Sequence, residues 1–72
     1  MLYPNPFNTI INISLPFDSK ITVTDSKGTK VSESNYYKGE NTLDLKRFES
    51  GVYYFLIQNK QMGMFTKKVV KL

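Results

Sequence analysis

Short runs in which apolar and polar residues alternate, separated by turn-forming residues, constrain the fold of this 72-residue chain more than any other feature. Alternation of period two is typical of a β-strand with one buried face, and no stretch has the 3.6-residue period of a helix. The runs lie at residues 11–15, 21–23, 29–37, 43–45, 52–57 and 64–70. Six or seven short strands, with turn signals about every 8–12 residues, predict an all-β fold. We expect a small antiparallel β-sandwich, with one domain spanning residues 1–72.

Three side chains and one run carry specific expectations about burial. Residues 52–57 are apolar throughout, so we expect a central strand covered on both faces. The Tyr53 hydroxyl should then lie at the rim of the sheet. We also expect Val31 to be buried by its strand and Phe48 to tuck under the loop before residue 52.

Glycines mark three of the predicted turns. Gly28 ends the hairpin sequence Asp-Ser-Lys-Gly, Gly39 lies in a turn at residues 38–41, and Gly51 closes the loop before residue 52. Glycine adopts a positive φ without the steric cost of a Cβ atom. We therefore interpret these three residues as structural.

The chain opens with the sequence Tyr-Pro-Asn-Pro-Phe-Asn. Proline fixes φ and disfavours helix in the preceding residue, so Pro4 and Pro6 predict a stiff, extended lead-in with a turn at Asn5. We expect Tyr3 and Phe7 to reach the core at either end of this segment. The lead-in then covers a sheet edge and plugs one end of the sandwich, or presents its prolines to a receptor, and the two roles are compatible.

The composition excludes several kinds of chemistry. The chain has no His and no Cys, which removes a Ser-His-Asp triad, a thiol nucleophile, disulfide staples and the usual zinc sites. We interpret the six scattered carboxylates as solvated surface charge, and a catalytic carboxylate pair is the enzyme chemistry left open. We expect no catalysis, no cofactor and no metal.

The net charge of +4 bears on the kind of partner. Most lysines stand singly at predicted turns, and basic residues cluster only at residues 46–47 and 67–71. We therefore expect weak attraction to acidic partners and no nucleic-acid binding. No stretch approaches the roughly 20 apolar residues of a membrane span. The chain shows no amino-terminal signal peptide, so we expect such a signal elsewhere in a longer parent protein.

The chain closes on a basic and apolar motif. Its residues are Lys67, Lys68, Val69, Val70, Lys71 and Leu72. We expect a last strand at the edge of a sheet, where lysines guard against edge-to-edge aggregation. Such a strand also suits capture by strand addition, because its edge groups supply affinity and its alternating side chains supply specificity. The same edge predicts weak self-association.

The remaining aromatic feature is two tyrosine pairs, Tyr36 with Tyr37 and Tyr53 with Tyr54. A sugar-stacking platform and a packed core both use such side chains. We favour core packing.

Taken in order, these segments resemble the carboxy-terminal sorting domain of type IX secretion cargo, the type A domain (Por secretion tail) of Bacteroidetes. The resemblance is carried by Tyr-Pro-Asn-Pro-Phe-Asn, Asp-Ser-Lys-Gly, Gly-Glu-Asn, Leu-x-Leu, Phe-x-Ser-Gly-Val-Tyr and Lys-Lys-Val-Val-Lys-Leu. It covers essentially the whole chain. Phe48 departs from the family pattern, in which leucine is frequent at that place.

The resemblance implies an immunoglobulin-like sandwich that directs a fused amino-terminal cargo domain to the outer-membrane translocon. Pro4, Asn5 and Pro6 match the family's opening motif, and residues 67–72 match its terminal motif, which implies that both groups are read by partner proteins. These partners would be the type IX translocon and the outer-membrane shuttle and sortase proteins. The cargo would pass through the periplasm to the cell surface or the medium, with no cofactor and no membrane insertion of the domain.

A second function stays open from the sequence. The same opening motif occurs in immunoglobulin-like domains related to the flagellar hook-capping protein. The alternative is therefore an immunoglobulin-like spacer, or a module of a secreted protein that binds carbohydrate or protein.

Overall fold

Seven strands and no helix are formed by residues 2–4 and 6–72, which are the residues that the computed structural model describes. The strands are β1 (Leu2–Tyr3), β2 (Ile10–Leu15), β3 (Ser19–Asp25), β4 (Lys30–Tyr36), β5 (Gly39–Asp44), β6 (Gly51–Asn59) and β7 (Gly63–Lys71). Each predicted run lies within one of the last six strands or overlaps it. The two-residue β1 was not expected.

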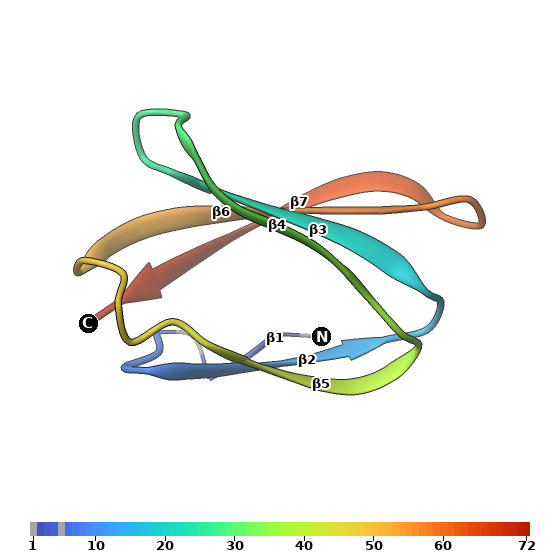
Figure 1. Cartoon of the computed structure of the whole chain (residues 1–72), viewed down its shortest axis with the longest axis horizontal. Coiled ribbons are helices and arrows are strands. Elements are labelled where there is room, and N and C mark those ends of the chain that lie inside the picture. Colours follow the sequence, from blue (N-terminus) through green and yellow to red (C-terminus); the bar gives the residue numbers. More distant parts are fainter. Residues whose placement is uncertain (1, 5) are drawn as a thin grey trace.

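The strands form two antiparallel sheets stacked as two layers (Figure 1). One sheet has the order β1-β2-β5 and the other has the order β4-β3-β6-β7. The chain changes layer after β2, after β4 and after β5, so each sheet combines strands that are distant in the sequence. This arrangement confirms the predicted antiparallel β-sandwich.

The core lies between the layers and is built from the inward positions of the alternating runs. The buried apolar side chains of the described residues are Phe7, Ile11, Ile13, Leu15, Ile21, Val23, Leu43, Leu45, Tyr53, Phe55, Ile57 and Val69. Full burial of a large apolar side chain contributes about 1.5–3 kcal/mol. Because the chain has no cysteine, this core and the sheet hydrogen bonds hold the fold together.

The expectation for residues 52–57 was half right. Strand β6 is central, since it lies between β3 and β7. Only its inward side chains Tyr53, Phe55 and Ile57 are buried, whereas Tyr54 on the outer face is exposed. A two-layer sandwich covers each sheet on one side only, so the apolar run did not indicate a third layer.

Two predicted core residues lie at the surface. Val31 is 40% exposed, because a register shift opposite Val23 and Thr24 takes it out of the alternation of β4. Tyr3 is also exposed, and its hydroxyl donates a long hydrogen bond of 3.4 Å to Glu40 Oε2. Phe7, the other aromatic residue of the lead-in, is buried as expected.

One turn is shorter than predicted. Strand β5 already begins at Gly39, so Glu40 and Asn41 pair with β2 and do not belong to a turn. The reversal is confined to Tyr37 and Lys38, where the Lys38 N–H donates to Asp18 Oδ1 at 2.8 Å. The Asp18 carboxylate, from the connection between β2 and β3, thus fixes this short reversal.

Candidate functional site

The lead-in and the end of β7 are joined by two backbone hydrogen bonds, which we call the clasp. The Phe7 N–H donates to the Val70 carbonyl at 2.9 Å, and the Leu72 N–H donates to the Phe7 carbonyl at 2.8 Å. Phe7 therefore forms a parallel bridge with Lys71. The structure thus brings together the two segments, opening and terminal, that the sequence singled out.

The Phe7 side chain anchors the clasp in the core, where it is fully buried. A second attachment follows, because the Leu45 N–H donates to the Thr9 carbonyl at 2.8 Å. Pro4 and Pro6 lie exposed beside this anchored residue. The predicted turn at Asn5 lies outside the described residues. The lead-in therefore closes one end of the sandwich and still presents its two prolines at the surface.

The terminal motif divides into an inner and an outer set. Val69 is buried and Lys71 is only 7% exposed, because both point to the inner face of β7, where Lys71 lies opposite Gly51. Lys67 and Lys68 are exposed, and Leu72 is 63% exposed. The exposed set can meet a partner directly, whereas the inner set belongs to the fold.

Among the three turn glycines, Gly51 lies next to this surface and has a φ of +147°. Its neighbour across the sheet is Lys71. Gly28 has a φ of +87° in the β3–β4 hairpin, and its N–H donates to the Asp25 carbonyl at 3.0 Å. Gly39 begins β5 at the opposite end of the sandwich (Figure 1).

The loop before β6 is fixed by Tyr53. The hydroxyl of this buried side chain donates to the Glu49 carbonyl at 2.6 Å. The centroids of its ring and of the Phe48 ring lie 5.5 Å apart. Phe48 is half-buried against the core, as expected. Burial raises the pKa of Tyr53, and the nearby carboxylates of Glu49 and Asp25 add to the effect. Tyr53 is a structural residue of this end of the sandwich.

The four tyrosines do not form a sugar-stacking platform together. Tyr53 is in the core, Tyr36 packs partly against it, and Tyr54 lies on the outer face of the sheet. Tyr37 is 80% exposed at the corner between β4 and β5. The expectation of core packing therefore holds for Tyr53 and in part for Tyr36.

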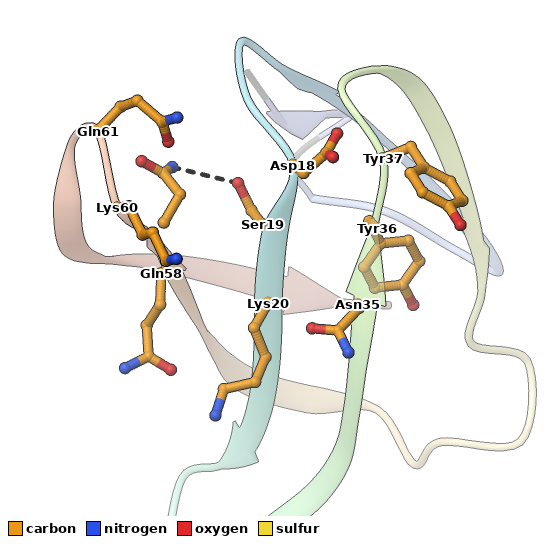
Figure 2. A pocket seen from close by; sticks show the side chains of 10 residues that line it. Asp18, Ser19, Lys20, Asn35, Tyr36, Tyr37, Gln58, Lys60 and Gln61 are labelled. Atoms are coloured by element: carbon orange, nitrogen blue, oxygen red, sulfur yellow. Dashed lines mark hydrogen bonds between the residues drawn. The ribbon is translucent and has the colours of Figure 1, made fainter.

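Sequence reasoning missed a hollow of about 500 Å³, which we call the polar hollow, at the end of the sandwich opposite the clasp (Figures 1 and 2). It is lined by Asp18, Ser19, Lys20, Asn35, Tyr36, Tyr37, Gln58, Asn59, Lys60 and Gln61. Inside it the Asn59 amide donates to Ser19 Oγ at 3.1 Å. These residues come from three corners of the fold that are distant in the sequence, so no local sequence motif predicts the polar hollow.

The sequence also showed no sign of a smaller apolar groove, of about 200 Å³, between the two layers. The apolar groove is lined by Leu2, Ile13, Ser14, Leu15, Pro16, Ile57, Met62, Phe65 and Lys67. Its walls are strands β1, β2, β6 and β7 with their adjoining turns. Lys67 is the residue of the terminal motif that lines it.

The described part of the chain contains no group of three or more acidic side chains that would suit a metal ion. It also contains no helix of the length and hydrophobicity needed to cross a membrane.

Comparison with known proteins adds one match. The family model described as the secretion system C-terminal sorting domain matches residues 1–72. Among curated proteins, none matches the chain.

Proposed function

The chain belongs to the family of secretion system C-terminal sorting domains, and we propose that it delivers its cargo as a folded signal that is read at the clasped end. Members of this family are C-terminal sorting signals for type IX secretion. The chain is therefore a sorting signal for export by that system, which it must engage while fused to a cargo domain.

The observation that carries the proposal is the clasp. A terminal motif read as an unfolded peptide would not need to enter the core. Here Val69 is buried and the Leu72 N–H is held by the Phe7 carbonyl, so the motif takes this conformation only when β7 is folded against Phe7 and the core. A folded end is also the form that costs a partner least entropy to bind.

We propose that the translocon contacts the exposed residues of this end. In the terminal motif these are Lys68 and Leu72, together with Lys67 further along β7, and in the lead-in they are Pro4 and Pro6. The proposal includes Asn5, which lies between the two prolines in the sequence. Cationic side chains here suit a partner surface that carries carboxylates, since complementary charge steers encounter and rejects wrong partners. Gly28, Gly39 and Gly51 serve the fold and not the contact.

We also propose the path that the cargo takes and the proteins that act on the domain. The cargo passes through the periplasm to the outer-membrane translocon and ends at the cell surface or in the medium. Shuttle and sortase proteins of the outer membrane act on the domain, whose sandwich is immunoglobulin-like. The domain itself acts by recognition alone, without catalysis and without a cofactor.

Charge changes on the exposed set test this proposal. Removing residues 67–72 would also remove Val69 from the core, so point variants are the cleaner choice. A periplasm-directed fluorescent protein is fused to residues 2–72 and expressed in a type IX-competent bacterium. We expect Lys68→Glu and Leu72→Asp each to lower export about tenfold, which corresponds to about 1.4 kcal/mol of lost binding.

The matched control is Lys27→Glu, which makes the same change in net charge in the exposed turn between β3 and β4. It should leave export unchanged. Equal export by all four fusions, with each domain folded by circular dichroism, would contradict recognition at the clasped end.

A binding module is the second candidate, and the polar hollow is the observation that favours it. Tyr37 and the amides of Asn35, Gln58 and Gln61 offer a ring face and paired donors and acceptors, which suit a sugar. A glycan array probed with the folded domain tests this function. Binding that is lost in Tyr37→Ala would support it, and an array without signal would reject it.

A further inference from the structure

The geometry points to a strand-docking site on the first half of β7, residues 63–67, for an extended acidic segment of the secretion machinery. In this site the segment adds to the sheet beside Met64 and Thr66 and inserts an apolar side chain into the apolar groove. A carboxylate of the same segment pairs with Lys67. The inference rests on the proposed sorting function and adds to the contacts at the clasped end a second contact on the first half of the terminal strand.

The two halves of the β7 edge differ. At the end of the strand, the Val70 carbonyl and the Leu72 N–H point away from β6, because both are bonded to Phe7. The clasp therefore occupies this half with the chain's own backbone. A partner strand adding there would first have to displace Phe7, whose side chain is fully buried.

The first half of the edge is open. The β6–β7 register runs without a break from Gly51 opposite Lys71 to Asn59 opposite Gly63, so outward backbone groups recur at every second residue. The N–H and C=O groups of Met64 and Thr66 thus point the same way as those of Val70. Within the described residues, no hydrogen bond reaches these outward groups. They are free to accept a strand.

The apolar groove lies beside this open edge. Phe65 and Lys67 line it from the inner face of β7, and Leu2 lines it from β1 in the other layer. A strand added next to β7 would place every second side chain over this space. Leu15 and Ile57 lie further in, so an aliphatic side chain is the group that the groove suits.

Charge identifies the occupant as acidic. Lys67 is the one charged residue among the described residues that line the apolar groove, it is exposed, and no ion pair within the described residues involves it. A second copy of the chain is a poor occupant, because antiparallel pairing of two β7 edges would bring like-charged lysines together, which destabilises a ladder. The net charge of +4 acts in the same direction.

One methionine extends the apolar surface at this place. Met62 is 54% exposed and lines the apolar groove. Methionine is flexible and polarizable, and it adapts to partners of different shape. A site that must accept one segment of the machinery in many cargo contexts gains from such adaptable contacts.

A proline at the open edge tests the inference. The Thr66 N–H points away from β6, so Thr66→Pro leaves the β6–β7 ladder intact and fits the rule that edge strands tolerate proline on the solvent side. It removes the donor and obstructs an incoming strand. In the export assay with the fusion to residues 2–72, we expect Thr66→Pro to reduce export at least about tenfold. Thr66→Val, which changes the side chain but keeps the N–H, should reduce export much less than Thr66→Pro.

A charge reversal provides an independent variant. Lys67→Glu changes an exposed side chain and should reduce export, whereas Lys27→Glu, the same change in a distant turn, should not. If Thr66→Pro fails to fold, which thermal unfolding of the purified domain would reveal, the comparison of Lys67→Glu with Lys27→Glu decides. Folded Thr66→Pro and Lys67→Glu domains that export like the parent would overturn the docking site and leave the sorting function standing. Failure of the parent fusion itself would reject the proposed function.

Discussion

A single hydroxyl fixes the loop that leads into β6. Tyr53 is buried, and its OH donates to the Glu49 carbonyl four residues earlier at 2.6 Å. The same relation, a tyrosine near a strand start that bonds back to the corner before it, stabilises other β-sandwiches. Because the loop ends at Gly51, opposite Lys71, this bond also positions the end of the terminal strand.

The first prediction concerns this hydroxyl. Tyr53→Phe keeps the buried ring and removes the hydrogen bond, so we expect the free energy of unfolding to fall by about 0.5–1.5 kcal/mol. Urea titration followed by circular dichroism measures the change. A variant as stable as the parent would show that the bond to Glu49 does not stabilise the corner.

The stability of the domain should also depend on pH through Glu33. The Thr22 hydroxyl donates to Glu33 Oε2 at 2.8 Å, and this bond, aided by Lys30 and Lys20, lowers the pKa of Glu33. A lowered folded-state pKa means that the stabilisation is present above the unfolded-state value of about 4.3 and is lost as the pH falls below it.

Glu33→Gln should therefore cost stability at pH 7 and little or nothing near pH 2. Parallel urea titrations of the two proteins from pH 7 to pH 2 measure this difference. A gap between parent and variant that stays constant over the whole range would contradict the assignment.

At the scale of elements, the lead-in and β7 depend on one another. Phe7 gives the lead-in its buried anchor and gives β7 a partner for its last residues. Phe7→Ala should cost about 3–5 kcal/mol, as large-to-small core changes do. A domain of this size has on the order of 4–11 kcal/mol of stability in total. Thermal unfolding should accordingly show a much lower midpoint, and an unchanged midpoint would mean that the clasp is not a stabilising element.

The fourth prediction follows from the unequal halves of β7. The amides of Phe65 and Lys67 lie opposite Ile57 and Phe55 in the ladder with β6, whereas the Thr66 amide points outward. In the free domain we expect the Thr66 amide to exchange with deuterium at least about tenfold faster than its two neighbours, because only theirs are held in the sheet. Hydrogen exchange followed by NMR measures this, and equal protection of all three amides would refute an open edge.

The strands themselves were largely predictable from local pattern, and their failures have physical reasons. Ile11, Ile13 and Leu15 face the core as their alternation indicates. Val31 does not, because a register shift depends on the partner strand and leaves no trace in local periodicity. The outward position of Tyr54 was not predictable either, because a continuous apolar run is compatible with a sheet covered on one face and with a sheet covered on both.

In the molecule as a whole, the candidate site is formed by contacts between residues that are distant in the sequence. The bonds of Phe7 to Val70 and Leu72 join segments near the two ends of the sequence, and Leu2 and Phe65 both line the apolar groove. No periodicity encodes such contacts. The family resemblance nevertheless pointed to both segments as candidate recognition sites, which remains a prediction. The family match over residues 1–72 confirms the family itself.

The central claim is that this folded domain directs cargo through the type IX system. The most direct measurement places the fluorescent fusion to residues 2–72 in a type IX-competent strain and in a matched strain whose translocon is inactive. The account predicts fluorescence at the cell surface or in the medium of the first strain, and retention in the periplasm of the second. The same distribution of a folded fusion in both strains would contradict it.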